Sequence, residues 1–502
     1  MIPRRRLAAL VALALAAHAG GARAQKNYQS APLGGRSALM GNTGVALAKD
    51  GAAPFLNPAT IGRIDDAKFA FSVNMYSASI AHYRDWHAPA GVDRGRFGAS
   101  DVEGASETQT RLDVLPSTLC FFFTLRGFGR TLGDESDAPR DDARGLRGRE
   151  KLALCLGTTE RSVADYPALN FRSRAGATQA QSFSRSWTRF QAGPTFSSYI
   201  TDDLALGISV HGSYASYEAN WSSTHVATDP RGSAVASSFA ASANAHAFDL
   251  AVIGGLTYRT SRGSQLGVSV MSQAGSPWGT FSANESSTVT RPDQARTSIA
   301  HGDFAAPLPF RLALGYGVEW PRLRVETNLV AYAPWRDALT ADLHVDEVTG
   351  GAAGVTTRGY DVVARERARP VVNTAMGFEY TWTPGTSLLG GVATDFSAAE
   401  RLTPRALPTI DLLHQDQVSR AIGSAGVRWH GRTAEILLGA QLAYGWGKAY
   451  ALNDFVVPSR LEVVDLRTYS GVFIIGGSAD LRAIGEAVRD VERAVVPQRR
   501  AP

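Results

Sequence analysis

The stretch FRLALGYGVEW, residues 310–320, carries the pattern that decides the fold. One set of alternate positions is large and apolar, and the other set is small or charged: Phe310, Leu312, Leu314, Tyr316, Val318 and Trp320 against Arg311, Ala313, Gly315, Gly317 and Glu319. Because side chains alternate between the two faces of a β-strand, the stretch predicts a strand with one apolar face. The alternation recurs around residues 204–210, 248–258 and 372–382. A water-soluble β-sandwich would alternate in the same way, so this pattern alone leaves the solvent open.

Connection lengths favour a membrane barrel over a sandwich. Short turns are expected at 201–203, 260–263, 321–322, 383–385 and 430–432, and long polar segments lie between them near 222–240, 283–305, 336–369, 397–416 and 447–465. Bacterial outer-membrane barrels have short periplasmic turns and long extracellular loops. We therefore expect an all-β fold, a transmembrane antiparallel β-barrel of about fourteen strands, with both ends in the periplasm because the number is even. The charged segment 126–149 is longer than a periplasmic turn, and its role is open.

Aromatic residues support the same interpretation. One precedes each short turn: Tyr199, Tyr258, Trp320, Trp382 and Trp429. Others follow further along the strands that leave those turns: Trp221, Trp278, Trp335 and Trp446. Aromatic side chains concentrate at the two membrane interfaces of such barrels, so we expect two interfacial girdles. The competing explanation is the general preference of aromatic residues for strands.

The N-terminus predicts export. Arg4, Arg5 and Arg6 precede an apolar run over 7–17, and Ala22-Arg23-Ala24 fits a signal-peptide cleavage site. The run is too short to span a bilayer as a helix, and no run of 18 apolar residues follows it. We expect four parts: a signal peptide at 1–24, an N-terminal hatch at 25–64, a barrel at 65–481 and a periplasmic tail at 482–502 that forms a short amphipathic helix. An uncleaved membrane anchor is the alternative for the first part.

Charge and motifs exclude several classes of protein. The chain has 51 basic and 46 acidic residues, and loss of the four arginines in 1–24 would leave 47 basic residues, close to neutrality. No basic stripe or known module indicates a nucleic-acid partner. There is no G-x-S-x-G, H-E-x-x-H or P-loop sequence, and the histidines lack metal-ligand spacing. We therefore expect no enzyme, catalytic residue, metal or cofactor.

The two cysteines fall on consecutive expected strands. Alternation places Leu119 and Phe121 outward and therefore Cys120 inward, and it likewise places Cys155 inward between Leu154 and Leu156. A disulfide between neighbouring strands forms only if the register brings the two Cβ atoms close together. A bonded pair and two free buried thiols are both compatible with the sequence.

The most specific sequence is MGNTGVALAKDGAAPFLNPA, residues 40–59. It resembles the N-terminal hatch of the FadL-type outer-membrane transporters of long-chain fatty acids and aromatic hydrocarbons. Met40-Gly41, Asp50 and Asn57-Pro58-Ala59 match the family pattern, whereas Thr60-Ile61 departs from its usual Gly-Leu. The layout of the barrel agrees as well, with a strand of the family type at 309–315.

The resemblance implies a hatch that involves Gly41, Gly44, Asn57, Pro58 and Ala59. Glycine allows positive φ and close packing, and Pro58 disfavours helix at Asn57. The competing explanation is an ordinary Gly- and Ala-rich leader.

The resemblance also implies passive passage of a hydrophobic small molecule, surrounded by outer-membrane lipid and lipopolysaccharide, in a Gram-negative outer membrane. Two alternatives stay open. One is a structural or assembly barrel that docks a protein partner. The other is a porin for small polar solutes, which a small polar lumen would favour, although Leu437, Phe473, Ile475 and Ile253 are expected to face inward. The sequence does not specify the ligand, the lateral gate or the oligomeric state.

Overall fold

A computed structural model describes residues 27–64, 68–84, 106–111, 115–125, 150–172, 178–228, 232–260, 263–273, 275–290, 293–399, 401–406, 416–431, 433–453 and 460–480. The expected signal peptide, the charged segment 126–149 and the expected C-terminal helix lie outside these residues. No helix in the described ranges is long and apolar enough to cross a bilayer.

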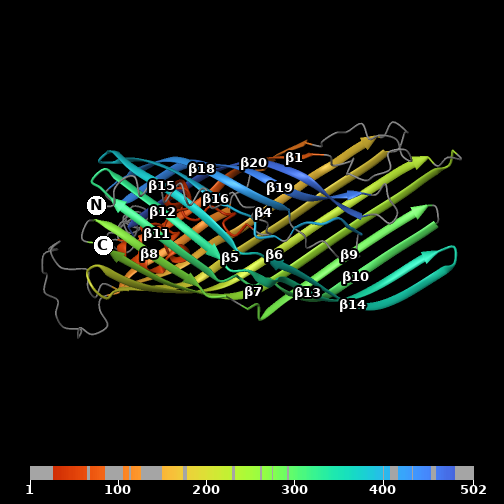
Figure 1. Ribbon diagram of the computed structural model, residues 1–502, viewed down its shortest axis with the longest axis horizontal. Helices are drawn as coiled ribbons and strands as arrows, with labels where there is room; N and C mark the ends of the chain where they lie inside the picture. The colour runs from red at the N-terminus through yellow and green to blue at the C-terminus, as the bar shows by residue number, and fades with distance from the viewer. Residues whose placement is uncertain are drawn as a thin grey trace, which may run out of the picture.

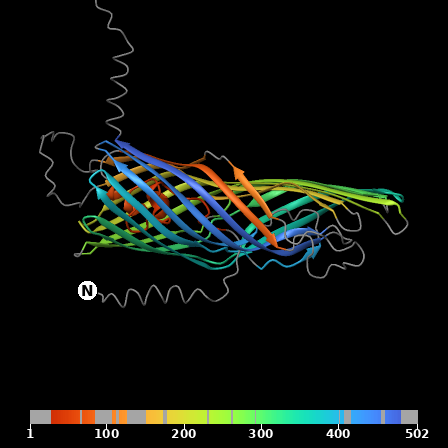
Figure 2. The same ribbon diagram turned by 90° about the horizontal axis from the view of Figure 1, so that it is seen from above.

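Fourteen antiparallel strands form one closed barrel, as the sequence predicted (Figures 1 and 2). Each strand pairs with the next along the wall, and the first, β1, pairs with the last, β20, from Lys68–Asp480 to Arg84–Asp465. The barrel strands are β1 (Lys68–Arg84), β3 (Leu115–Leu125), β4 (Glu150–Arg172), β5 (Thr178–Tyr199), β6 (Leu204–Thr228), β7 (Ala234–Arg259), β8 (Ser264–Met271), β11 (Arg311–Glu319), β12 (Leu323–Tyr332), β15 (Val371–Thr383), β16 (Thr386–Asp395), β18 (Gln417–His430), β19 (Ala434–Asn453) and β20 (Arg460–Asp480).

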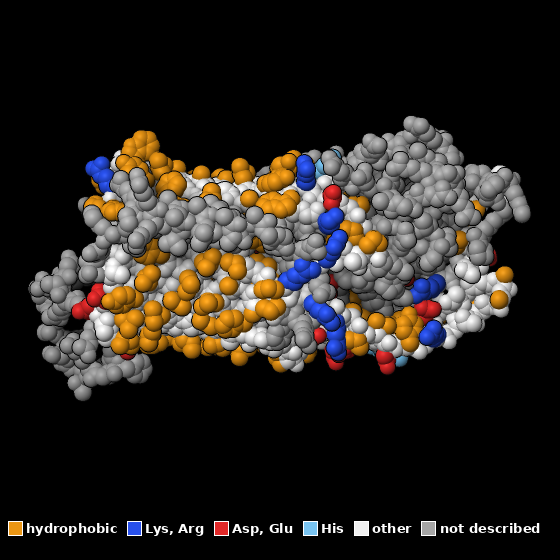
Figure 3. All heavy atoms as spheres, viewed as in Figure 1, with side chains coloured by type: hydrophobic (Ala, Val, Ile, Leu, Met, Phe, Trp, Pro, Cys, Tyr) orange, Lys and Arg blue, Asp and Glu red, His pale blue; other side chains and the backbone are white. Residues whose placement is uncertain are grey.

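The outer wall carries the apolar faces that alternation predicted. In β11, Leu314 and Tyr316 are exposed on the outer wall, whereas Arg311 and Ala313 are buried. Figure 3 shows apolar side chains spread over the visible face of the half of the molecule that holds the short turns, where they form a band. Apolar side chains exposed in such a band fit the hydrocarbon layer of a membrane. The short turns therefore mark the periplasmic end of the barrel.

Four strands that the sequence did not predict extend the wall on the extracellular side. They are β9 (Trp278–Thr290), β10 (Asp293–Ala305), β13 (Trp335–Gly351) and β14 (Gly354–Ala368). They continue the sheet from β7 in the order β7-β9-β10-β13-β14 (Figure 1). The segments 222–240, 283–305 and 336–369 are thus largely paired strands, and their interpretation as long polar loops was wrong. Two shorter strands, β2 (Ser106–Arg111) and β17 (Arg405–Ala406), pair with β1 and β20.

The aromatic residues before the short turns need one correction. Tyr258, Trp320, Trp382 and Trp429 are exposed on the outer wall, and Trp382 is the most open at 65%. Tyr199 is only 7% exposed, and its ring lies against Gly62 inside the barrel. Counting from the exposed Phe196, Tyr199 falls on the opposite face, so Ile200 takes the outward position instead. That the other four form an interfacial girdle stays a prediction.

Two further face assignments were wrong. Trp221 lies on the inner face, where its ring contacts Phe183 at 5.3 Å between centroids. In β20, Phe473 is exposed and Ile474 is buried, so Phe473 and Ile475 belong to the outer face. Leu437 and Ile253 are buried on the inner face, as expected.

The outer wall gives a first testable prediction. Leu314→Arg places a charge in the middle of β11 and is expected to cost roughly 2–4 kcal/mol, whereas Trp382→Arg beside a short turn should cost about 0–1 kcal/mol. The measurement is the free energy of unfolding in lipid vesicles during a denaturant titration. Equal costs at the two positions would mean that the apolar band is not the membrane-facing band.

Candidate functional site

The N-terminal segment, residues 27–64, lies inside the barrel. It contains two short helices and a 3-10 helix: α2 (Arg36–Leu39), α3 (Ala53–Leu56) and η1 (Pro58–Arg63). Helix α2 packs against β16, β18 and β19, and η1 packs against β5, β6 and β7 on the other side of the lumen. Almost every residue of the segment is buried. The segment therefore fills the cross-section of the barrel near its periplasmic end.

Wall glycines allow the segment to approach the strands closely. A Cβ atom at Gly267 would lie 2.1 Å from the Val45 carbonyl oxygen, and one at Gly377 would lie 2.0 Å from the Met40 carbonyl oxygen. Inward glycines of this kind occur around the wall: Gly207, Gly255, Gly267, Gly315, Gly377, Gly391, Gly426 and Gly439. Any side chain at these positions would overlap the segment, so their small size fixes how deeply it docks.

The five residues that the resemblance implicated lie together in this docked segment. Gly41 has φ +71°, in the left-handed region that favours glycine, and a Cβ there would lie 2.8 Å from the Val392 nitrogen. Gly44 lies against Leu56. Pro58 and Ala59 approach the backbone of Gly207, where a Cβ atom would lie 2.5 Å from each.

Asn57 is buried and connects three parts of the molecule. Its amide nitrogen donates to the Val45 carbonyl at 2.6 Å and to the Leu256 carbonyl of β7 at 3.1 Å. Its amide oxygen accepts from the Ala59 nitrogen at 3.1 Å, which begins η1. An Asn at this position therefore closes the turn that begins η1 and also bonds the segment to the wall.

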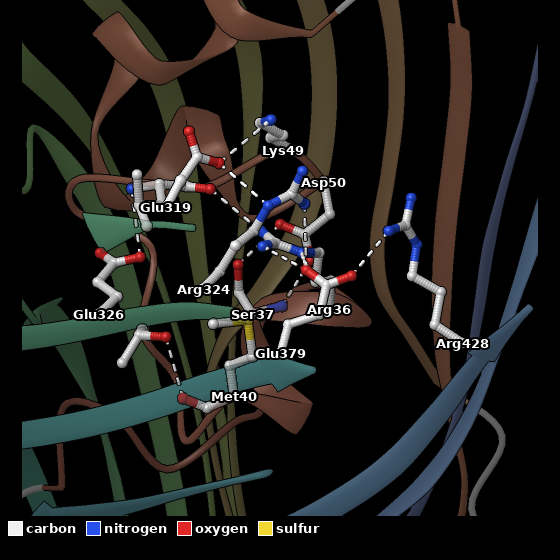
Figure 4. Close-up of polar contacts among 12 residues, drawn as sticks. Arg36, Ser37, Met40, Lys49, Asp50, Glu319, Arg324, Glu326, Glu379 and Arg428 are labelled. Atoms are coloured by element: carbon white, nitrogen blue, oxygen red, sulfur yellow. Dashed lines mark hydrogen bonds and ion pairs between the residues drawn. The ribbon is translucent and has the colours of Figure 1, made fainter. Parts of the chain in front are cut away.

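An ion-pair network that sequence reasoning missed holds the segment from the opposite wall (Figure 4). Glu379 of β15 accepts from Arg36 of the segment at 2.7 Å, and also from Arg428 of β18 at 2.8 Å and Arg324 of β12 at 3.3 Å. The Arg36 and Glu379 side chains are 4% and 2% exposed. Glu379 is the central acceptor of the network because three arginines pair with it. Loss of its carboxylate would leave Arg36 as a buried charge without a partner, which is strongly destabilising.

Two further carboxylates extend the network towards Lys49 and the backbone of the segment. Glu319 of β11 pairs with Arg63 and with Lys49, the latter at 3.5 Å. Glu326 of β12 accepts from the backbone nitrogens of Gly44 at 3.0 Å, Ala46 at 2.7 Å and Leu47 at 3.2 Å. Alternating sequence patterns place these acids inward, but nothing in the sequence pairs them with residues some hundreds of positions away.

A small cavity lies between the segment and the wall, with a volume of about 50 Å³. Its lining is mainly apolar and includes Tyr28, Leu33, Phe55, Leu308 and Tyr332, with Glu160, Gln191 and Arg311 as polar members. The Tyr28 and Tyr332 rings stack at 4.6 Å between centroids. Arg311 donates to the Phe55 carbonyl at 2.7 Å. Pockets that hold small molecules have roughly 300–1,000 Å³, so this cavity is closed to a ligand of ordinary size.

The two cysteines lie opposite each other on neighbouring strands. Register pairs Cys120 of β3 directly with Cys155 of β4, and the structure joins them as a disulfide on the inner face. Both belong to a buried apolar cluster that includes Phe55 and Ala48 of the segment. Within the described ranges, no group of three His, Cys, Asp or Glu side chains is placed to hold a metal ion.

No family model and no curated protein sequence matches this chain. Solved structures match over almost the whole chain. A Pseudomonas aeruginosa FadL homologue shares 14% sequence identity, covers 91% of this chain and 100% of its own, and has a TM-score of 0.53. The P. putida toluene transporter TodX shares 14% over 91% of this chain and 99% of its own, with a TM-score of 0.53. A TodX mutant, described as a monoaromatic hydrocarbon channel, shares 14% over 90% and 99%, with a TM-score of 0.56.

At these identities the likeness establishes the fold. The chain has the fold of FadL-type outer-membrane channels, which confirms the resemblance that residues 40–59 indicated. This fold and the apolar outer wall fit a multi-pass β-barrel of the outer membrane.

Proposed function

We propose that this barrel passes hydrophobic small molecules, such as long-chain fatty acids or aromatic hydrocarbons, passively across the outer membrane. The observation that carries the proposal is the apolar cavity beside Tyr28, which the N-terminal segment closes to about 50 Å³. A ligand can enter only if the segment moves, and polar contacts rather than covalent bonds hold it. The segment would thus be the hatch, with Gly41, Gly44 and Asn57-Pro58-Ala59 at its docking points.

An irregularity in the wall supports a lateral exit. The pairing of β4 with β5 shifts between Thr158 and Glu160, and Thr159 at this bulge lines the cavity. The next residue but one, Arg161, donates its backbone nitrogen to Ser30 Oγ of the segment at 2.9 Å. A bulge interrupts the ladder between strands. Movement of the segment would therefore loosen the wall at the place where the cavity reaches it, and the ligand would pass into the surrounding lipid and lipopolysaccharide.

The mechanism requires no cofactor and no chemical step. The carbonyl and carboxylate groups that bind the segment would exchange their partners for water when it moves. If the protein were instead a porin for polar solutes, its lumen would have to conduct water and small solutes while the segment stays docked. A docking role for the barrel draws its support from the extracellular sheet of β9, β10, β13 and β14, which offers a partner a large surface.

Locking the segment to the wall tests the proposal. A Cβ atom at Gly35 would lie 3.8 Å from Ser72 Cβ of β1, which suits a disulfide. Gly35→Cys/Ser72→Cys, in a background with Cys120→Ala and Cys155→Ala, is expected to abolish uptake of a labelled long-chain fatty acid and of toluene into vesicles. A reductant should restore it.

A control pair keeps the result specific. Ser238 of β7 and Thr288 of β9 pair directly in the extracellular part of the wall, with their hydroxyl oxygens 2.7 Å apart. Ser238→Cys/Thr288→Cys crosslinks the wall away from the segment and should leave uptake unchanged. Uptake that survives the locked segment would contradict the hatch. Sugar uptake that exceeds hydrophobic uptake in the unmodified protein would favour the porin, and no uptake of either would favour the docking role.

A further inference from the structure

A groove on the outer wall lies apart from the lumen and from the segment. Its volume is about 420 Å³, and its lining includes His82 of β1, Arg401 of the loop after β16, Trp446 and Lys448 of β19, and Arg467 of β20. The strand side chains named here belong to the outward set of alternate positions, because the neighbouring Tyr83, Ala449 and Leu466 are buried. Gly447 and Leu466 also line the groove. We call this feature the outer-wall groove.

The strand register shows that the groove begins where the apolar band ends. Tyr444, Tyr469 and Ile80 form one exposed row across β19, β20 and β1. The next outward row is Trp446, Arg467 and His82. One further step brings Lys448 opposite Asp465. Over roughly 13 Å of strand, from Tyr444 to Lys448, the wall therefore changes from aromatic and apolar side chains, through a row that contains Trp446 and Arg467, to the charged pair of Lys448 and Asp465.

This order of side chains matches a membrane interface on its outer side. Aromatic rings prefer the depth of the headgroups, and cations beyond them meet the charged groups of the lipid. On the face of the molecule that Figure 3 displays, a line of Lys and Arg side chains follows the border between the apolar band and the extracellular part. The groove thus lies at the outer-leaflet headgroup level, away from the periplasmic turns.

The charge of the groove favours an anion. Lys448 is paired with Asp465 at 3.1 Å, and both side chains are about half exposed. In the described part of the chain, no carboxylate pairs with Arg401 or Arg467, which line the same groove. Arginine presents a planar fork of donors that fits phosphate oxygens in a bidentate manner. A volume above 300 Å³ is that of a ligand site and exceeds what a single ion needs.

We infer that the outer-wall groove binds the phosphorylated headgroup of an outer-leaflet glycolipid, with Arg401 and Arg467 on a phosphate and Trp446 against the sugar or the first carbons of an acyl chain. The lipid A part of lipopolysaccharide has this chemistry, since its phosphates lie on sugars directly above the acyl chains. This inference is independent of what passes through the lumen.

The experiment compares two pairs of substitutions in the full chain, purified in detergent and refolded to its heat-resistant form. Arg401→Gln/Arg467→Gln alters the groove. Arg259→Gln/Arg322→Gln is the matched control, because both of these arginines are exposed beside periplasmic turns. The probes are lipid A with both phosphates, the same lipid after enzymatic removal of its phosphates, and inorganic phosphate. Retained lipid is counted by native mass spectrometry, and affinity is measured by titration.

The groove pair is expected to weaken binding of phosphorylated lipid A roughly thirty-fold, if each arginine contributes as basic residues near anionic membranes do. The control pair should change it less than two-fold, and the dephosphorylated lipid should bind no better to the unmodified protein than to the groove variant. Trp446→Ala should weaken lipid A binding and leave binding of inorganic phosphate unchanged.

Equal effects of the two arginine pairs would overturn the inference, as would equal binding of phosphorylated and dephosphorylated lipid. Inorganic phosphate that competes fully with lipid A at the same concentration would show a phosphate site without lipid recognition and would also overturn it. The heat-resistant gel mobility of each variant shows that a loss of binding does not come from an unfolded barrel.

Discussion

Replacing Gly267 of β8 with valine is expected to displace the N-terminal segment while leaving the barrel closed. The new Cβ would lie 2.1 Å from the Val45 carbonyl oxygen and 2.9 Å from Ala46 Cα, and both are backbone atoms that cannot rotate away. The same carbonyl accepts from Asn57 at 2.6 Å, so the bond that closes the turn at η1 would be lost as well. Overpacking of this kind costs about 1–3 kcal/mol, which raises the population of the displaced segment about 5- to 150-fold.

The measurement is the conductance of single barrels in planar lipid bilayers, together with entry of a bulky polar antibiotic into cells that carry the variant. Both should rise. Gly423→Val is the matched control, because nothing lies within 4 Å of a Cβ at Gly423 and the residue is on the outer side of β18. An unchanged conductance for Gly267→Val, with a barrel that still resists heat, would mean that the segment does not block the lumen.

Glu379→Gln is expected to loosen the segment at least as strongly, from the opposite wall. Arg36 is almost fully buried and would keep its charge without a carboxylate partner, for which the typical cost is about 3–5 kcal/mol. Arg428 should suffer less, because it also pairs with Glu435 at 2.5 Å. The measurement is hydrogen exchange at the Gly44, Ala46 and Leu47 amides, which donate to Glu326 and report directly on docking.

A double variant separates docking from general damage. Arg36→Met/Glu379→Met removes the buried pair together and is expected to restore much of the protection, since apolar replacements of a buried ion pair are often tolerated. Glu347→Gln breaks a pair with Arg296 in the extracellular sheet and should leave the three amides unaffected. Exchange that rises equally in Glu379→Gln and Glu347→Gln would contradict the role of the network.

The sequence predicted the barrel well because its two environments are chemically opposite. Lipid on one side and a packed lumen on the other force residues such as Leu314 and Ala313 to alternate, so both the fourteen strands and the faces of β11 follow from the pattern. The outward orientation predicted for Tyr199 was wrong because it was based on the position of the residue before a turn. Its spacing from the exposed Phe196 places it on the inner face. The inward orientation predicted for Phe473 was wrong because apolar residues occupy both faces of β20 around it, so alternation does not distinguish the two faces there.

The extracellular strands were missed for a related reason. Beyond the membrane the outward face meets water, and in β10 the buried positions are occupied by small residues such as Ser298 and Ala300, between Thr297, Ile299 and His301. Small residues that alternate with polar ones resemble a loop in composition, although their period is that of a strand. The contacts between the segment and the wall could not be predicted from the sequence either, because Arg36 and Glu379 come together only when the whole barrel closes.

The seam between β1 and β20 has a consequence for how such a chain becomes a barrel. Lys68 and Asp480 stand near the two ends of the described chain, so their pairing closes the longest loop in the molecule and is entropically the last contact to be gained. Residues 27–64 are synthesised before any strand, yet they bond to β7, β12, β15 and β18. A segment that contacts these strands early would align their registers before the seam forms, and would thus act as an internal template for closure of the barrel.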